Sequence, residues 1–310
     1  MEHPTGLAVS ERLPAGQAER GLIVVLVHGS LDRSTSFGRV LRRLEDLHTV
    51  VYDRRGYHRS RHALPVRTTL DGHVEDLLAV IDGRPSVVVG HSYGGTIALA
   101  AALRRDPFPT IAAVAAYEPP MPWLPGWPNR GGTDRGGAVG VDPDQEAERF
   151  FRRVVGSDAW DRLTDSARAE RRADGPALVA ELTAIRVAEA PFDVSRLAVP
   201  TLFGRGERSL PHHRQAVGWL GAHVAGSVVV DIPGATHGAH LSHPDAFAAL
   251  VRRTVRAANS GRAEPSGPTP PTPPAPSTPP TPPDEPDEPD RSSGVGSDLA
   301  PSLAPEGNYA

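Results

Sequence analysis

Cysteine and lysine are both missing from the 310-residue chain. Without cysteine the protein has no disulfide, no thiolate nucleophile and no cysteine-ligated zinc or iron–sulfur centre. Without lysine it has no Schiff base, no Walker-type phosphate lysine and no Ser-x-x-Lys hydrolase site. These two absences exclude several classes of enzyme chemistry.

Long hydrophobic runs are missing as well. No apolar stretch approaches the roughly 18 residues that a membrane-spanning helix needs. Residues 1–16 lack the charged start and the apolar stretch of about 7–15 residues that mark a secretory signal. We therefore expect a cytoplasmic protein without a membrane partner.

Proline and negative charge are concentrated near the C-terminus. Residues 259–310 hold 15 of the 33 prolines and carry a net charge of −6, against −4 for the whole chain, which leaves +2 for residues 1–258. A segment of this composition cannot bury enough apolar surface to offset the entropy lost on ordering, so we expect residues 259–310 to form a disordered tail. The nearly neutral remainder gives no electrostatic reason to expect nucleic acid as a partner.

Short β-branched apolar runs alternate with segments of helical periodicity. The runs expected to form strands are Leu22–Val27, Val50–Asp53, Ser86–Gly90, Ile111–Tyr117, Pro200–Gly204 and Ser227–Ile232. The segments with helical spacing are Phe37–Leu47, Leu70–Ile81, Thr96–Leu103, His213–His223 and Pro244–Ala257. This alternation predicts an α/β fold with right-handed βαβ units and a mostly parallel central sheet flanked by helices.

The interval from Pro119 to Phe192 interrupts the alternation. It opens with a proline-rich stretch and the glycine-rich segment 131–140, which is a loop by composition. Three segments with helical character follow: Glu146–Val155, Asp158–Leu163 and Pro176–Glu189. We therefore expect a helical cap, residues 121–192, inserted into a core made of residues 1–120 and 193–258.

The strongest local motif is GHSYGG at Gly90–Gly95, which fits the pattern G-x-S-x-G. It lies between an expected strand and an expected helix, which is the context that a nucleophile elbow requires. Glycines at 90 and 94 suit the strained turn that would lift the Ser92 hydroxyl out of the sheet. The motif predicts Ser92 as a nucleophile, and an ordinary Gly-Ser turn is the alternative.

A tight turn at His28–Ser30 ends the strand expected at Leu22–Val27. It can direct the backbone N–H of Ser30 to the same point as the N–H of Tyr93, and two such donors would stabilise an oxyanion. His28 itself is expected to be a hydrogen-bonded structural residue. Asp53 and Arg54 are likewise expected to brace loops.

A histidine-rich loop, PGATHGAHL, follows the last expected strand. A neutral His237 in this loop can reach Ser92 and act as its general base. His240 and His243 follow at three-residue steps, but no carboxylate or cysteine accompanies them at ligand spacing, so neither a metal nor another cofactor is expected. His212 and His213 are expected to be ordinary surface residues.

The motifs HGS, YDRRG, GHSYGG, YEPP and PGATHGAHL occur in an order that resembles the α/β-hydrolase fold superfamily, over roughly residues 6–258. The likeness is to the branch of esterases, cofactor-free haloperoxidases and carbon–carbon hydrolases, with a helical cap inserted after the sixth strand, here Ile111–Tyr117. The resemblance implies a Ser–acid–His triad, and Ser92 and His237 carry over directly.

The acid of this triad does not carry over directly. The family usually places an aspartate in a G-x-x-D turn after the strand that follows the cap, and here that turn is Gly206–Ser209, with serine at its last position. Glu118, at the end of Ile111–Tyr117, and Glu207, inside the turn, are the two candidate acids. We favour Glu118, and a site without a true acid remains the third alternative.

These features together predict a serine hydrolase that cleaves a small carboxylic ester through an acyl-enzyme. Trp123 and Trp127 follow Glu118 closely and are candidates for lining the pocket of a small apolar acyl substrate. The alternatives are a carbon–carbon hydrolase or lyase, a perhydrolase, and a non-catalytic ligand-binding protein on the same scaffold. Nothing in the sequence indicates an oligomeric state.

Overall fold

The computed structural model describes residues 6–14, 21–63, 69–104, 110–128, 141–185, 187 and 189–260. All of the described residues belong to the first of the two units into which the chain divides, residues 1–264. The glycine-rich segment 131–140 and nearly all of the expected tail lie outside the described residues. The last helix continues to Ser260, so the first two residues assigned to the tail belong to this helix.

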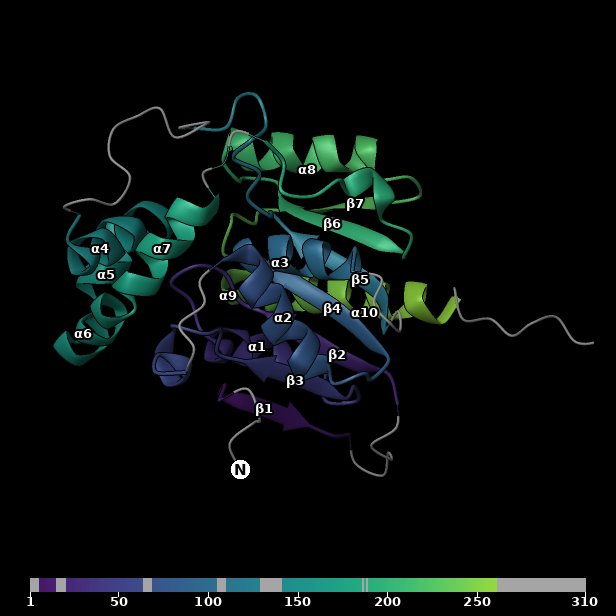
Figure 1. Cartoon of the computed structure of the whole chain (residues 1–310), viewed down its shortest axis with the longest axis horizontal. Helices are drawn as coiled ribbons and strands as arrows, with labels where there is room; N and C mark the ends of the chain where they lie inside the picture. The colour runs from purple at the N-terminus through teal and green to yellow at the C-terminus, as the bar shows by residue number, and fades with distance from the viewer. Residues whose placement is uncertain are drawn as a thin grey trace, which may run out of the picture. The chain divides into compact units, whose positions relative to one another are not determined.

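A seven-stranded sheet with the order β1-β3-β2-β4-β5-β6-β7 forms the centre of the first unit (Figure 1). The parallel strands are β2 (Ile23–Val27), β3 (Thr49–Tyr52), β4 (Ser86–His91), β5 (Ile111–Tyr117), β6 (Thr201–Gly206) and β7 (Val228–Ile232). An antiparallel edge strand, β1 (Val9–Arg12), pairs with β3. The sequence did not predict β1, because its residues VSER include only one apolar side chain. The expected α/β fold with a mostly parallel sheet is confirmed.

Helices cover both faces of the sheet because successive strand residues point to opposite sides. Val25 and Val88 pack in one cluster with the helices α2 (Leu70–Ile81), α3 (Tyr93–Ala102) and α8 (Pro211–His223). Val24 and Val87 pack in a second cluster, on the opposite face. The short helices on that face are α1 (Gly38–Leu41) and α9 (Ala239–Ser242), beside the long α10 (Pro244–Ser260). Strands buried on both sides explain why their sequences are continuous apolar runs rather than alternating ones.

Between β5 and β6 the described residues form four α-helices: α4 (Pro143–Val154), α5 (Ser157–Asp161), α6 (Asp165–Ala173) and α7 (Gly175–Ile185), drawn in teal in Figure 1. We call them the inserted helices. The sequence missed α6 because none of its nine residues is buried, so its sequence DSARAERRA carries no apolar periodicity. The strand before the insertion was expected to be the sixth. It is the fifth of the strands in the described residues, because only β1 precedes β2 there.

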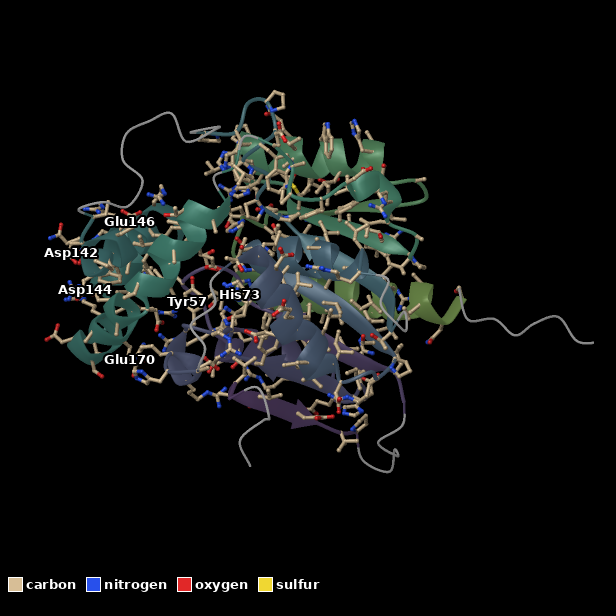
Figure 2. The ribbon with its side chains drawn as sticks, in the orientation of Figure 1. Tyr57, His73, Asp142, Asp144, Glu146 and Glu170 are labelled. Atoms are coloured by element: carbon tan, nitrogen blue, oxygen red, sulfur yellow. The ribbon has the colours of Figure 1, made fainter. Side chains whose placement is uncertain are left out.

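Buried charges attach the inserted helices to the core. Arg54 and Tyr57, both from the loop after β3, donate hydrogen bonds to the carboxylate of Glu181 in α7. Arg61 donates to Asp174, at the end of α6, with Nη2 2.6 Å from Oδ1. Figure 2 shows Tyr57 and His73 where the inserted helices meet the core.

The start of α4 is acidic. Asp142, Asp144 and Glu146 lie there, and the fourth acid labelled in Figure 2, Glu170, lies in the second half of α6 and accepts a hydrogen bond from Arg33 (2.8 Å). Asp142 caps α4 by accepting a hydrogen bond from the N–H of Asp144 (3.0 Å).

Within the described residues, no helix is both long and apolar enough to cross a membrane.

Candidate active site

Ser92 occupies the sharp turn between β4 and α3. Its backbone has φ 52° and ψ −128°, a conformation that side-chain-bearing residues rarely adopt, and it is the N-cap of α3. A Cβ at Gly90 or Gly94 would lie 2.1–2.2 Å from a backbone oxygen, so both positions require glycine. The turn expected from G-x-S-x-G is therefore present, and it leaves the serine partly exposed to solvent.

Glu118 and His237 form a hydrogen-bonded pair at the carboxyl edge of the sheet. The Nδ1–H of His237 donates to Oε2 of Glu118 at 2.8 Å, and the N–H of Gly206 donates to Oε1 at 2.7 Å. Glu118 has φ 45° and its side chain is fully buried. Because Nδ1 carries the proton in this pair, Nε2 is the basic nitrogen of the His237 ring.

Glu207 lies on the exposed side of the neighbouring turn. Its Oε2 accepts a hydrogen bond from the N–H of Gly234 (2.8 Å), which ties the turn after β6 to the turn after β7. Ser209, at the position where the family has an aspartate, is buried at 7% exposure. Of the two candidate acids, the structure brings Glu118 to His237 and gives Glu207 a bracing contact.

The His28–Ser30 turn passes directly against the nucleophile turn. A Cβ added at Gly29 would lie 2.9 Å from Cβ of Ser92. The buried ring of His28 donates from Nδ1 to the carbonyl of Gly29 (2.8 Å) and accepts at Nε2 from the N–H of Arg54 (2.8 Å). Burial and the charge of Arg54 lower the pKa of His28 to about 3, so this ring is a neutral brace for the turn.

A cavity of about 560 Å³ lies above these groups. Ser30, Ser92, Tyr93 and His237 all line it, so the structure brings the expected oxyanion donors, nucleophile and base to one place. The inserted helices supply apolar lining from α4 and α7, namely Phe150, Val154, Leu182 and Ile185.

The two tryptophans proposed for the pocket have different positions. Trp127 lines the cavity, and its ring meets the ring of His212 edge-on, with 4.8 Å between the centroids. Trp123 is not among the described residues that line the cavity. It is buried, and its ring packs edge-on against Phe192 with 5.9 Å between the centroids.

His213 was expected to be ordinary surface, and this expectation is wrong. Its ring stacks on the ring of His237, with 4.4 Å between centroids and 19° between planes, and it lines the cavity. Burial and the charges of His237 and His212 lower the pKa of His213 to about 2, so a neutral ring lies against the candidate base. This contact could not be predicted from local sequence patterns, because the two rings come from turns that follow different strands.

The model of the alpha/beta hydrolase family matches residues 24–250 of the chain. A pimeloyl-[acyl-carrier protein] methyl ester esterase from Nitrosospira multiformis is 29% identical over 251 residues, which is 75% of this chain and 94% of that protein. Lipase LipV from Mycobacterium tuberculosis is 34% identical over 110 residues, or 34% of this chain and 39% of the lipase. The chain thus matches about two fifths of the lipase's length.

Solved structures show the same fold at low sequence identity. The enol-lactonase from Burkholderia xenovorans superposes with a TM-score of 0.61 at 20% identity, covering 81% of this chain and 97% of that one. A bromoperoxidase from Bacillus anthracis superposes with a TM-score of 0.62 at 19% identity, and the match covers 80% of this chain and 94% of the bromoperoxidase chain. At this level of identity the likeness concerns the fold and not the substrate.

Proposed function

The chain belongs to the alpha/beta hydrolase family, and we propose that this hydrolase cleaves small carboxylic esters through an acyl-enzyme on Ser92. The resemblance noted from the motifs is thereby confirmed at the level of the family. The observation that carries the proposal is the hydrogen bond between Glu118 and His237, beside a serine in a nucleophile turn that lines the same cavity.

The buried carboxylate of Glu118 sets the direction of proton transfer. It accepts the Nδ1 proton of His237, which leaves Nε2 to take the proton of the Ser92 hydroxyl as that oxygen attacks the ester carbonyl. The negative charge of Glu118 then stabilises the imidazolium. His237 returns the proton to the leaving alcohol, and the same steps with water release the acid.

The oxyanion of the tetrahedral intermediate would accept hydrogen bonds from the backbone N–H groups of Ser30 and Tyr93. Both residues line the cavity beside Ser92, and Tyr93 opens helix α3, whose N-terminal amides favour negative charge. Loss of one such donor typically lowers the rate about 100- to 1000-fold.

The cavity supports an apolar acyl substrate. Its volume of about 560 Å³ is in the range of a small-molecule site, and Phe150, Leu182 and Ile185 give it an apolar wall from the inserted helices. We propose that these helices act as the cap of the site. The names of the relatives include a methyl ester esterase and a lipase, which agrees with an ester as substrate.

The experiment is labelling with a fluorophosphonate probe together with hydrolysis of a short p-nitrophenyl ester. We expect the wild-type protein to be labelled on Ser92, and Ser92→Ala to lose labelling and at least about 1000-fold in turnover while keeping its melting temperature. Ser209→Ala is the matched control, because Ser209 also lines the cavity, and it should still be labelled. A labelled or active Ser92→Ala variant would overturn the proposal.

The same labelling experiment, extended with a β-diketone substrate and with added peroxide, separates the alternatives. A ligand-binding protein on a hydrolase scaffold would not react with the probe. A carbon–carbon hydrolase or lyase would react and would cleave a β-diketone faster than the ester, and a perhydrolase would form a peracid when peroxide is added.

A further inference from the structure

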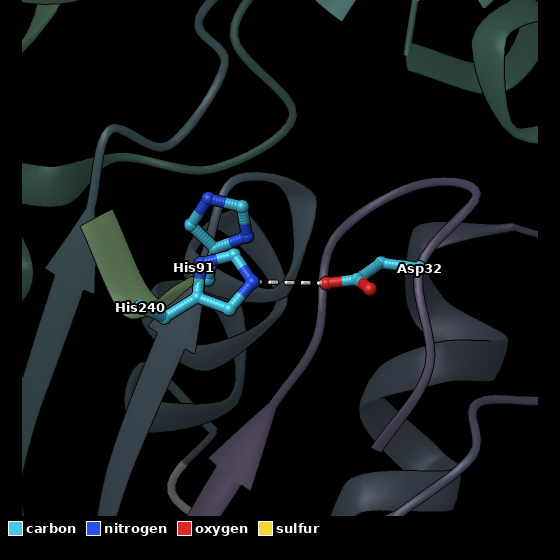
Figure 3. Close-up of side chains that lie close together, drawn as sticks. All are labelled: Asp32, His91 and His240. Carbon is cyan, nitrogen blue, oxygen red and sulfur yellow. Dashed lines mark ion pairs between the residues drawn. The ribbon is translucent and has the colours of Figure 1, made fainter. Parts of the chain in front are cut away.

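A second group of ionisable side chains lies behind the nucleophile turn. His91 is the last residue of β4, His240 belongs to α9, and Asp32 lies in the loop after β2 (Figure 3). Each offers a ligand-type atom, and these atoms all lie within 4.8 Å of one another. None of the three belongs to the described residues that line the cavity.

The histidine nitrogens of this group are buried and poorly satisfied, and Nε2 of His240 has only an ion-pair contact with Asp32. His91 is 6% exposed and His240 is 2% exposed. Neither Nδ1 of His91 nor either ring nitrogen of His240 has a hydrogen-bond partner in the part of the chain that the structure describes. Buried polar atoms are normally satisfied, so a buried group of poorly satisfied ligand-type atoms within 4.8 Å of one another points to a missing ligand.

The contacts around the group prepare His91 and Asp32 to bind a cation. The Nε2–H of His91 donates to the carbonyl of His237 (2.8 Å), which leaves the lone pair on Nδ1. The hydroxyl of Ser36 donates to Oδ2 of Asp32 (3.0 Å). A metal-binding histidine usually donates its second nitrogen to a carbonyl in this way, and a ligating carboxylate is usually hydrogen-bonded as well.

The spacing of the group fits a metal ion better than a direct hydrogen bond. Nε2 of His240 makes an ion-pair contact with Oδ2 of Asp32 at 3.4 Å, drawn dashed in Figure 3, which is longer than the roughly 3.2 Å upper end of ordinary N–H···O hydrogen bonds. Two ligand atoms that are each about 2.1 Å from a tetrahedral zinc ion lie about 3.4 Å apart. We infer that Asp32, His91 and His240 form a binding site for one divalent transition-metal ion, with Zn²⁺ as the best match.

The Asp32 carboxylate gives this site a route to solvent. Its side chain is 17% exposed, so an ion and a fourth, water ligand can approach from that side. Two imidazoles and one carboxylate make a borderline-soft ligand set, which suits Zn²⁺, Co²⁺ or Fe²⁺ better than Mg²⁺ or Ca²⁺. The sequence did not predict the site because the carboxylate stands far upstream of the histidine loop.

An ion here would join three loops that also carry the cavity groups. His91 precedes Ser92, Asp32 follows Ser30 by two residues, and His240 follows His237 by three. The ion would hold these loops together without touching the substrate. It is therefore a structural site, and its existence does not depend on the proposed ester hydrolysis.

The test uses the full chain after removal of metal with a chelator. We expect one Zn²⁺ per chain to bind and to raise the melting temperature, and Co²⁺ to produce the visible absorption of a four- or five-coordinate site. Asp32→Asn, an isosteric change of a partly exposed side chain, should weaken Zn²⁺ binding at least about 100-fold. His240→Gln should weaken Zn²⁺ binding to a similar extent. If His240→Gln does not fold, the result for Asp32→Asn alone tests the inference.

Two variants provide the controls. His223→Gln removes a histidine that stacks on Trp219, away from the group, and should bind Zn²⁺ as the wild type does. His213→Gln removes a histidine that lies close to Glu118 and His237, a second set of ligand-type atoms, and should also retain binding. Ser92→Ala should bind Zn²⁺ normally even though it is inactive.

Three outcomes would overturn the inference. The first is wild-type protein that binds neither Zn²⁺ nor Co²⁺ and shows no change in melting temperature. The second is binding that is lost in His213→Gln and kept in Asp32→Asn, which would place the ion at the candidate base. The third is a stability that depends on pH but not on metal, which would make Asp32 and His240 an ion pair only.

Discussion

Two neighbouring turns, after β5 and after β6, each carry a glutamate, and the two glutamates have different environments. Glu118 is buried with φ 45° and its carboxylate contacts His237. Glu207 is exposed and holds the N–H of Gly234. The direction in which the chain leaves each strand decides which carboxylate points at the histidine. A carboxylate at the carboxyl edge of the sheet is therefore not by itself sufficient to identify the acid of the triad.

Hydrogen bonds connect the two turns. The N–H of Glu118 donates to the carbonyl of Gly204 (3.0 Å), and Oε1 of Glu118 accepts from the N–H of Gly206 (2.7 Å). One carboxylate oxygen is thus held by the turn in which the family usually has its aspartate, and the other faces His237. The acid reaches the same histidine from the adjacent strand.

Removing the charge at the first turn gives the largest expected effect. Glu118→Gln keeps the shape of the side chain but no longer stabilises the imidazolium or fixes the tautomer of His237. We expect kcat/KM for a p-nitrophenyl ester to fall about 1000- to 10000-fold. If Glu118→Gln retained near-normal activity, Glu118 would not be the acid of the triad.

Moving the acid to the second turn is a sharper test. Ser209→Asp in the Glu118→Gln background places a carboxylate at the position where the family has one. We expect kcat/KM to recover about 10- to 100-fold relative to Glu118→Gln alone, because either strand end can then present an acid to His237. Ser209→Asn in the same background is the control and should give no recovery.

Stability should fall in mild acid because burial keeps His213, beside the second turn, neutral. Its folded pKa of about 2 is below the usual value of 6.5, so between these values the unfolded chain binds the additional proton. The free energy of unfolding therefore decreases as pH falls from 6.5 toward 2. From pH 7.5 to pH 5, urea titrations should show a loss about 1–2 kcal/mol larger in the wild type than in His213→Gln. Equal losses would mean that His213 is exposed in solution.

Removing the charge at the exposed glutamate should matter least. Glu207→Gln keeps an oxygen that can accept from the N–H of Gly234, so the turn remains braced. We expect kcat/KM to stay within about threefold of the wild type and the free energy of unfolding within about 0.5 kcal/mol. A loss comparable to that of Glu118→Gln would reverse the assignment of the two carboxylates.

The sequence predicted those parts of the fold that continuous apolar runs or short motifs specify. The strands β2 to β6 were found because both of their faces are buried, and the Ser92 turn because glycine is required on each side of it. The edge strand β1 and the polar helix α6 were missed because little or none of their surface is buried. Hydrophobic periodicity carries no signal for such elements.

Contacts between distant turns were the least predictable part of the site. The stacking of His213 on His237, and the grouping of Asp32 with His91 and His240, depend on how separate strand ends meet. The sequence predicted no metal because no carboxylate or cysteine stands near His240 along the chain, whereas Asp32 reaches His240 from a distant loop. The roles of Ser30 and Tyr93 as oxyanion donors stay predictions, since they concern a reacting substrate.

Detection of the acyl-enzyme itself tests most directly whether Ser92 is the nucleophile. A p-nitrophenyl ester is mixed with the protein, the reaction is acid-quenched within the first turnovers, and intact mass and peptide mapping locate the adduct. We predict a mass increase of one acyl group on Ser92, formed much more slowly in Glu118→Gln than in Glu207→Gln. An ester that turns over without any adduct, or with an adduct on another residue, would contradict it.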